Sequence, residues 1–347
     1  MSINWENVKH VLVVRLRSIG DTVLATPSLL ALRRHLPEAR IDVLLEDWVA
    51  PVLDGFGAVD NVIRVSKKSK DRIRLARLLR RTQYDVAFNL HGGTTSTFLV
   101  RASGAKHRVG FSNYQYGFLY NHRLSSASDF WEQKKTHSAE QQLALLGFTG
   151  VPVKDKPKTH LDVTEDALTS IEKRIKSEIR NPKSKIAMLH PAAAFATKQW
   201  AAENFARVAG FLSEKGFQVM AVAAKRERPV LDELERSART EVLAFDDLTL
   251  PEITALASRA AVFVGNDSGI AHIAGAVGTP SVVIFGSSNR DHWRPWTDAP
   301  HQIVYEEFAC QPCPGYTCAE FGEPRCILSV RVEKVIEATE RLLPTSV

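Results

Sequence analysis

Hydrophobic runs typical of buried strands alternate with amphipathic helical patterns along almost the whole chain. In the first half, these patterns follow one another in the order VLVVRL (11–16), TPSLLALRRHL (26–36), IDVLL (41–45), VAPVLDGF (49–56), VIRV (62–65), RIRLARLLRR (72–81), DVAFNL (85–90) and STFLVRAS (96–103). A β-α-β-α succession of this kind predicts a parallel sheet with helices on both of its faces.

The same alternation restarts after a stretch rich in Pro, Lys and Asp and a further helical pattern that ends at Arg180–Pro182. From residue 185 it runs KIAMLHP, ENFARVAGFLSEKG, FQVMAVAA, RPVLDELERSA, TLPEITALASRA, AVFVGND, IAHIAGAVG and PSVVIFG. A chain of 347 residues is also long for a single core. We therefore predict two doubly wound α/β domains in tandem, residues 1–180 and 181–330, joined near Arg180–Pro182. A last helix is expected within 331–347.

The pattern is less regular between Phe111 and Asp129, where aromatic and basic residues mix. Tyr114, Tyr116, Phe118 and Tyr120 are spaced by two, and this spacing is typical of a strand face or a hairpin. The alternative is a flexible loop that contacts a partly apolar ligand. The local sequence leaves both interpretations open.

The formal net charge is +6, and much of the basic charge gathers between Arg64 and Arg81. These basic residues alternate with Ile73, Leu75, Leu78 and Leu79, as expected of a basic amphipathic helix. Its charged face is either simply solvated or a surface for an anionic partner such as an acidic glycolipid headgroup or nucleic acid. Because the chain shows neither a run of about 20 apolar residues nor a signal-peptide pattern, we expect a cytoplasmic protein.

All four cysteines lie in one short segment, at Cys310, Cys313, Cys318 and Cys326. A cytosolic chain keeps its thiols reduced, so the clustering favours metal ligation or a stapled loop over a disulfide framework. The first pair is Cys-x-x-Cys, but the remaining spacing matches no standard zinc pattern well. A metal at this cluster is therefore not the favoured interpretation.

The segment Val262–Gly286 combines a buried strand with features of a ligand site. Polar residues that can cap a helix follow the strand, and Gly269 permits close approach before a helix of small residues. The start of such a helix suits a diphosphate, because its N–H groups are unpaired and its dipole is positive there. Asp267 either caps the helix or contacts a ligand. His272, one turn into the helix, is either a packing residue or faces the same ligand.

A second candidate loop, residues 192–200, follows the strand-like run KIAML. Its short side chains at 192–194 let backbone N–H groups approach an anion, and Lys198 supplies a point charge. The alternative for Lys198 is a solvated loop lysine.

The first strand-to-helix turn carries an acid, Asp21, where many nucleotide-binding folds carry several glycines. Judged from its surroundings alone, Asp21 is a helix cap. The chain has no G-x-G-x-x-G after this strand and no G-x-x-x-x-G-K-[ST], so dinucleotide dehydrogenases and P-loop kinases lack their main signatures. H-E-x-x-H and G-x-S-x-G are also absent from the sequence.

Three segments together resemble the lipopolysaccharide heptosyltransferases, glycosyltransferase family 9. They are R-S-I-G-D-T-V-L-A-T-P at 17–27, the Lys-Gln-Trp loop at 192–200, and T-L-P-E-I through G-N-D-S-G-I-A-H and G-T-P-S-V to F-G at 249–286. The resemblance implies a GT-B fold, in which two Rossmann-like doubly wound domains face each other across a cleft. It also implies that the N-terminal domain binds the acceptor, that the C-terminal domain binds the donor, and that the final helix returns to the N-terminal domain.

The resemblance further implies roles for individual residues. Asp21 matches the general base of an inverting transfer, which needs no enzyme nucleophile. Lys198, with Thr197, matches the contact to the donor diphosphate and replaces a divalent metal there. The remaining implied positions are Asp267, Ser268, Gly269 and His272 at the donor, Glu227 at the adenine or ribose, and Arg17, Ser18, Gly20 and His137 on the acceptor side.

The implied donor is ADP-heptose, and the implied acceptor is a hydroxyl of the lipopolysaccharide inner core, on lipid A-Kdo or on heptose. No cofactor or nucleic acid is expected. The basic helix and the aromatic segment 111–123 would then serve contact with acidic glycolipid at the cytoplasmic face of the inner membrane. The alternatives are a transferase or epimerase for another nucleotide sugar, and a catalytically silent nucleotide-sugar-binding protein.

Overall fold

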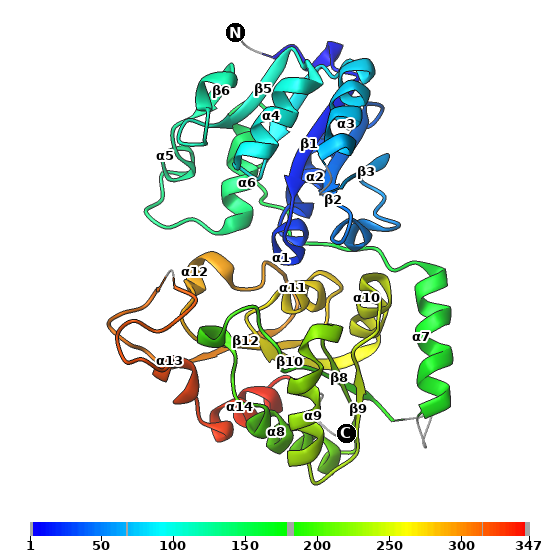
Figure 1. Cartoon of the computed structure of the whole chain (residues 1–347), viewed down its shortest axis with the longest axis vertical. Helices are drawn as coiled ribbons and strands as arrows, with labels where there is room; N and C mark the ends of the chain where they lie inside the picture. The colour runs from blue at the N-terminus through cyan, green and yellow to red at the C-terminus, as the bar shows by residue number, and fades with distance from the viewer. Residues whose placement is uncertain (1–2, 67–68, 179–183, 314, 344–347) are drawn as a thin grey trace. The chain divides into compact units, whose positions relative to one another are not determined.

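The structure, a computed structural model, describes residues 3–66, 69–178, 184–313 and 315–343. It divides into an N-terminal unit, residues 1–162, and a C-terminal unit, residues 163–347. Figure 1 labels many of the helices and strands of both units. Among the described residues, we find no helix whose length and hydropathy would let it cross a bilayer.

The N-terminal unit is built on a parallel six-stranded sheet with strand order β3-β2-β1-β4-β5-β6. Its strands are β1 (His10–Leu16), β2 (Arg40–Glu46), β3 (Asn61–Val65), β4 (Val86–Asn89), β5 (His107–Phe111) and β6 (His122–Leu124). Its helices are α1 (Ile19–Val23), α2 (Thr26–His35), α3 (Ser69–Thr82), α4 (Thr94–Ser103), α5 (Ala127–Trp131) and α6 (Ser138–Gly147), with short 3-10 turns η1 (Trp5–Asn7), η2 (Ala50–Leu53) and η3 (Gly117–Leu119). Helices cover both faces of the sheet, so its central strands are buried and apolar.

The C-terminal unit repeats this architecture with strand order β12-β11-β10-β7-β8-β9, again entirely parallel. Its strands are β7 (Ile186–His190), β8 (Gln218–Val222), β9 (Val242–Phe245), β10 (Ala260–Asn266), β11 (Ser281–Phe285) and β12 (His301–Tyr305). Its helices are α7 (Glu165–Glu178), α8 (Ala202–Glu214), α9 (Arg228–Ser237), α10 (Leu250–Arg259), α11 (Gly269–Ala276), α12 (Arg290–Trp293), α13 (Arg325–Leu328) and α14 (Val332–Glu340), with 3-10 turns η4 (Ala196–Lys198) and η5 (Lys225–Glu227). Trp200 and Phe205 are fully buried in its core and meet edge to face.

The division between the units falls earlier than the expected boundary at residue 180. Helix α7 packs against α10, through a 2.7 Å hydrogen bond from Ser170 to Glu252 and a 2.7 Å ion pair between Arg259 and Glu172. The Pro-rich stretch before it is tied to the N-terminal unit, where Gly57 N donates to Asp162 at 3.0 Å. The expected linker, Arg180–Pro182, lies outside the described residues.

The final helix corrects a second expectation. Instead of returning to the N-terminal unit, α14 packs against α8 and buries Val335 in the core of the C-terminal unit. A 2.7 Å ion pair between Arg207 and Glu333 flanks this contact. The apolar stripe of α14 thus covers the same sheet face as α8, and this burial fixes the helix where it is.

The aromatic segment 111–123 is neither a hairpin nor a plain loop. Strand β6 pairs in parallel with β5, and η3 forms part of the connection between them. Tyr120 is buried and hydrogen-bonded to Asn89, whereas Tyr116 and Phe118 are exposed. The four rings, although spaced by two, therefore do not share one face: Tyr116 and Phe118 point outward, and Tyr120 points inward.

Candidate active site

Both sheets place their loops for ligand binding by the same rule. In each sheet the chain starts at one of two central strands, adds strands toward one edge, and then returns to the other central strand and adds strands toward the opposite edge. The central pair is β1 and β4 in the N-terminal unit, and β7 and β10 in the C-terminal unit. Ligands of open parallel sheets collect at the carboxyl ends of such a pair. The segments found there are 17–21 and 90–93 in one unit, and 191–198 and 267–269 in the other.

Asp21 lies in the turn after β1 and has both carboxylate oxygens engaged. Its Oδ1 forms an ion pair with Arg15, and its Oδ2 accepts from Ser18 N at 3.3 Å and from Ser18 Oγ at 3.0 Å. Asp21 therefore does cap the short helix α1, as the local sequence predicts. Its side chain nevertheless keeps 22% of its surface exposed, so a ligand has access to it.

Arg15 holds this turn from inside the sheet. It belongs to β1 and its residue is buried, yet its guanidinium reaches the end of the sheet, where Nη1 donates to the Leu90 carbonyl oxygen. Its Nε also donates to the Asp21 backbone oxygen at 3.3 Å. Arg15 thus links the loop after β1 to the loop after β4 and orients Asp21.

His91 is the second contribution of the β4 loop. Asn89 accepts from His91 N and Gly92 N at 3.0 Å each, and this arrangement turns the chain sharply. Gly92 has φ +83°, and a Cβ there would lie 2.5 Å from the Tyr114 ring, so only glycine fits. Burial, together with the neighbouring Arg15 and Arg17, lowers the pKa of His91, so its ring is neutral near pH 7.

The other predicted acceptor-side residues divide into two groups. Arg17 and Ser18 are exposed beside Asp21, and Gly20 is buried within α1. His137 is the N-cap of α6: its buried ring accepts from Ala139 N at 3.1 Å, and its backbone N–H donates to Glu140 at 2.8 Å. The structure thus gives His137 a capping role.

In the C-terminal unit, Lys198 and Asp267 form a 2.8 Å ion pair between the loops after β7 and β10. The same Asp267 oxygen accepts a short hydrogen bond from the Ser288 hydroxyl. Only 5% of the Asp267 side-chain surface is exposed, compared with 21% for Lys198. The Asp267 carboxylate is thus compensated and buried, whereas the Lys198 side chain keeps part of its surface exposed.

The cap of α11 is Ser268 rather than Asp267, because the Ser268 side chain accepts from Ala271 N. Gly269 begins the helix, and His272 lies one turn further and is buried. Asn266, at the end of β10, braces the two loops: it accepts from Trp200 N at 3.1 Å and donates to the Pro191 carbonyl at 2.8 Å. The result is a fixed helix N-terminus beside a partly exposed lysine.

Thr197 and Glu227 have structural partners of their own. The buried Thr197 hydroxyl accepts from Ser287 at 3.0 Å and donates to the Gly315 carbonyl at 3.3 Å. Glu227 lies after the neighbouring strand β8, where it accepts from Ala224 N at 3.0 Å and caps η5. Thr197 thus anchors loops, and Glu227 lies at the next strand end along the same sheet edge.

Sequence reasoning missed three residues that complete these clusters: Arg15, His91 and Ser288. Arg15 interrupts the apolar run VLVVRL, and His91 opens the pair of glycines after DVAFNL. A charged residue inside an apolar run and a histidine beside two glycines, each at the end of a predicted strand, could both have indicated a functional position. Ser288 follows the strand-like run PSVVIFG by two residues and gave no signal of its own.

Comparisons with known proteins agree with this architecture. The sequence profile of glycosyltransferase family 9 (heptosyltransferase) matches residues 72–322. Lipopolysaccharide heptosyltransferase 3 of Escherichia coli strain K12 is 28% identical over 351 aligned residues, covering 95% of this chain and 96% of that protein.

Two solved structures share the fold along nearly the whole chain. A glycosyltransferase family 9 protein from Veillonella parvula superposes with a TM-score of 0.84 at 22% identity, covering 97% of this chain and 98% of that one. The E. coli ADP-heptose lipopolysaccharide heptosyltransferase II gives 0.80 at 21% identity, covering 96% and 98%.

Two parallel Rossmann-like units, each with a charged cluster at its central strand ends, give this chain the GT-B fold class of these solved structures. Since the family profile covers most of the sequence, the chain belongs to glycosyltransferase family 9, the heptosyltransferases. The predictions of family, fold class and enzyme class are confirmed.

Proposed function

We propose that this protein transfers heptose from ADP-heptose to a hydroxyl group of the lipopolysaccharide inner core, with inversion at the anomeric carbon. The observation that carries the proposal is the opposite exposure of the two ion pairs. In the N-terminal unit the carboxylate is the more exposed partner, and in the C-terminal unit the ammonium group is. The first arrangement suits proton abstraction, and the second suits an anionic leaving group.

On the acceptor side, Asp21 is the general base. Its Oδ2 accepts from the Ser18 hydroxyl at 3.0 Å, and an acceptor hydroxyl can take this place when substrate binds. Arg15 pairs with the other oxygen, Oδ1, so Oδ2 is the oxygen that would receive the proton. Direct attack on the anomeric carbon needs only this one base, because no glycosyl-enzyme intermediate forms.

On the donor side, Lys198 and the N-terminus of α11 bind the diphosphate. Lys198 supplies a positive charge, and α11 supplies backbone N–H groups not used inside the helix. Both stabilise the charge that develops on the departing ADP. Asp267 and Ser288 are positioning residues that hold the lysine at the loop surface.

The relatives support this choice of substrates. The E. coli relative is a lipopolysaccharide heptosyltransferase, and the solved heptosyltransferase II is described as an ADP-heptose enzyme. We therefore place ADP-heptose at Lys198 and α11, and the inner-core acceptor at Asp21.

A product analysis tests the reaction. The purified chain is incubated with ADP-heptose and either Kdo-lipid A or a heptosylated acceptor, and ADP release is followed together with the linkage formed. We expect release only with a matching acceptor and a product whose anomeric configuration is opposite to that of the donor. Retained configuration would contradict the single-base mechanism, and release from another nucleotide sugar alone would contradict the donor.

We also propose peripheral contact with an anionic membrane, through a surface formed by α3, α4 and η3. Arg72, Arg74 and Arg77 on α3 are exposed, and so are Ile73 and Leu78 of the same helix. Helix α3 packs on α4, whose exposed Phe98 meets Tyr116 at 5.1 Å between ring centroids. Phe118, 74% exposed, extends this aromatic group. Cationic and apolar side chains side by side are what a lipid headgroup layer attracts.

Sedimentation with phosphatidylglycerol vesicles tests this contact. We expect the native chain to bind, and the variant Arg72→Glu/Arg77→Glu to lose most binding at low salt. Arg239→Glu/Arg331→Glu, at two exposed arginines of the C-terminal unit, is the control with the same change of charge. Equal loss in both variants would show that total charge matters and that this surface does not.

A further inference from the structure

His91 belongs to the acceptor-side cluster, yet the proposed transfer gives it no role. It follows β4 closely, at the carboxyl end of a central strand. Asn89 accepts from the backbone N–H groups of His91 and Gly92 at 3.0 Å each. Gly92 in turn lies against the Tyr114 ring, where a Cβ would come within 2.5 Å of it. The backbone that carries the His91 ring is therefore held from two sides.

The same loop is tied to the turn that carries Asp21. Leu90, the residue before His91, accepts from the guanidinium of Arg15, and Arg15 forms the ion pair with Asp21. The His91 ring itself forms a hydrogen bond with the backbone of Arg17, within the same turn as Asp21. His91 therefore reaches from the loop after β4 to the loop after β1, where the proposed base lies.

The surroundings of the His91 ring favour its neutral form. Burial has the largest effect on the pKa of His91 and lowers it, and the Arg15 and Arg17 guanidinium groups lower it further. The Asp21 carboxylate and the hydrogen bond with the Arg17 backbone act in the opposite direction but do not reverse the shift. A neutral imidazole can lie near two guanidinium groups without charge repulsion, whereas a protonated one would add a third positive charge.

We propose that His91 is a positioning residue for the transfer: its neutral ring holds the turn 17–21 so that the Asp21 carboxylate meets the acceptor hydroxyl. The inference rests on the proposed function, because that function makes Asp21 the base. Protonation of His91 would disturb this arrangement in two ways. The proton on Nδ1 would be buried without an acceptor among the described residues. The new positive charge would also compete with the acceptor hydroxyl for the carboxylate.

The pH dependence of kcat, with both substrates saturating, tests this role. The amide of His91→Gln can donate a hydrogen bond but does not titrate, so kcat at pH 8 should stay within about threefold of native. As pH falls below about 6.5, native kcat should decrease more than that of His91→Gln. His91→Ala cannot hold the turn, so its kcat at pH 8 should fall by about 10–100-fold. KM for the donor should not change, because the proposed donor residues lie in the other unit.

His122→Gln is the matched control. His122 belongs to the same sheet and burial also lowers its pKa, but it begins β6 and so lies at the amino ends of the parallel strands. Its replacement should leave the native dependence of kcat on pH unchanged. The native pH dependence in His91→Gln, or native kcat in His91→Ala, would overturn the positioning role.

An NMR titration tests the contact between His91 and Asp21 without any turnover. The carbon-bound ring protons of His91, assigned by their absence from His91→Gln, should titrate below about pH 6.5 in the native chain. Asp21→Asn should lower this pKa further, because it removes the negative charge that favours the protonated ring. A pKa of His91 that Asp21→Asn leaves unchanged would overturn the inference, even in a chain that transfers heptose. The expected shift in a chain that transfers no heptose would support the coupling of His91 to Asp21 and contradict only the proposed substrates.

Discussion

The N-terminal unit buries the cation of its ion pair and leaves the carboxylate accessible, whereas the C-terminal unit does the reverse. Asp21 is 22% exposed beside an Arg15 side chain at 10%, and Lys198 is 21% exposed beside Asp267 at 5%. Both pairs lie at the carboxyl ends of the central strands of the same sheet topology. The same sheet topology therefore presents the acidic partner of an ion pair in one unit and the basic partner in the other.

The strongest test of this difference is Asp21→Asn. This change keeps the shape of the side chain and removes its capacity to accept a proton, so we expect kcat to fall by about 10²–10⁴-fold. ADP affinity, measured by calorimetry, should stay within about twofold, because the proposed donor residues lie in the other unit.

Ser18→Ala is the matched control for Asp21→Asn, since it removes the hydroxyl that Asp21 accepts from but not the base. It should change kcat far less. A rate for Asp21→Asn within a few-fold of native would remove Asp21 from the mechanism and leave it a helix cap.

Lys198→Met should have the next largest effect. Removing the cation weakens stabilisation of the leaving diphosphate, so we expect kcat/KM for the donor to fall by about 10²-fold, with weaker ADP binding. Lys225→Met, an exposed lysine of the same unit, should bind ADP normally. Normal ADP affinity in Lys198→Met would show that the lysine is only the structural partner of Asp267.

Asp267→Asn sharpens the comparison, because it should weaken donor binding, whereas Asp21→Asn should lower kcat. Without the buried carboxylate, Lys198 loses its 2.8 Å partner and its fixed position, and we expect ADP affinity to fall by about 10-fold. With saturating donor, kcat should recover most of its native value, unlike in Asp21→Asn. A kcat loss at saturation as large as that of Asp21→Asn would mean that Asp267 takes part in the chemistry.

The smallest effect concerns pH. Burial lowers the pKa of His190, whose Nδ1 lies 2.8 Å from the Val222 carbonyl oxygen. As pH falls through about 6.5, the unfolded chain takes up a proton at this position and the folded chain does not. The free energy of unfolding should therefore decrease toward acid, by at most about 1.4 kcal/mol per pH unit from this group.

His190→Asn removes the titration and keeps a side-chain donor for Val222. Urea unfolding at pH 7.5 and pH 5.5 should show a smaller acid loss in the variant than in the native chain. Equal losses in both would mean that His190 does not contribute to acid sensitivity.

Much of the fold was readable from the alternation of patterns, because strands buried on both faces are almost purely apolar. The division of the chain between the two units was not readable from the sequence. Helices α7 and α14 are amphipathic, and their local sequence does not show which of the two cores their apolar face contacts. Their partners, α10 and α8, are distant in sequence or become neighbours only once the sheet has formed. The 331–347 helix was accordingly placed on the wrong unit.

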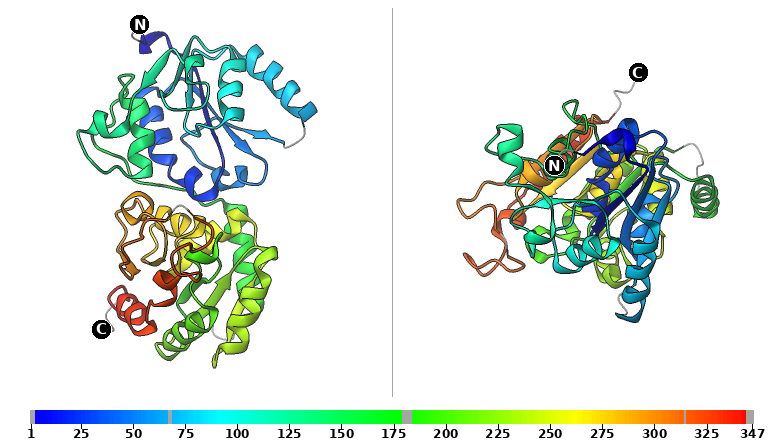
Figure 2. Two further views of the ribbon diagram at one scale, coloured as in Figure 1. Left: turned by 60° about the vertical axis from the view of Figure 1, so that its left-hand side comes forward. Right: turned by 90° about the horizontal axis from the view of Figure 1, so that it is seen from above.

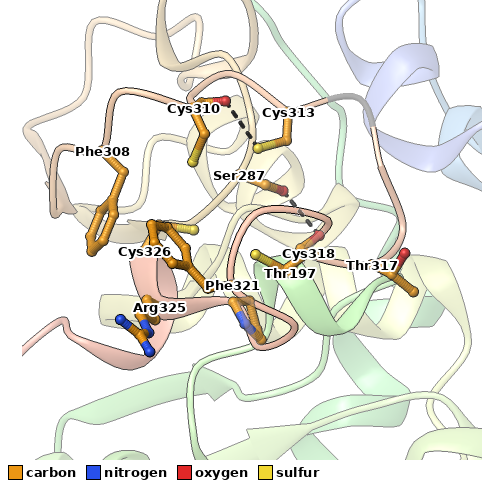
Figure 3. Close-up of a pocket in the computed structure, with 11 residues that line it drawn as sticks. Thr197, Ser287, Phe308, Cys310, Cys313, Thr317, Cys318, Phe321, Arg325 and Cys326 are labelled. Atoms are coloured by element: carbon orange, nitrogen blue, oxygen red, sulfur yellow. Dashed lines mark hydrogen bonds between the residues drawn. The ribbon is translucent and has the colours of Figure 1, made fainter.

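The site was only partly readable, for a similar reason. Asp21, Lys198 and Asp267 stood out as charged residues in strand-to-helix turns. The cap at Ser268 and the anchoring role of Thr197 depend on hydrogen bonds that spacing alone cannot choose between. The cysteines show most clearly what the sequence cannot predict. Seven residues separate Cys318 from Cys326, yet both line the same cavity in the folded chain (Figure 3).

The repeated strand order has a consequence for how such proteins diversify. Each unit completes its own sheet and its own charged cluster, and the division falls between residues 162 and 163. Under the proposed function the acceptor and the donor bind to different units, so the preference for each could change by separate mutations. Hybrid proteins made by joining the N-terminal unit of one relative to the C-terminal unit of another at this junction would then take their acceptor preference from the first parent and their donor preference from the second.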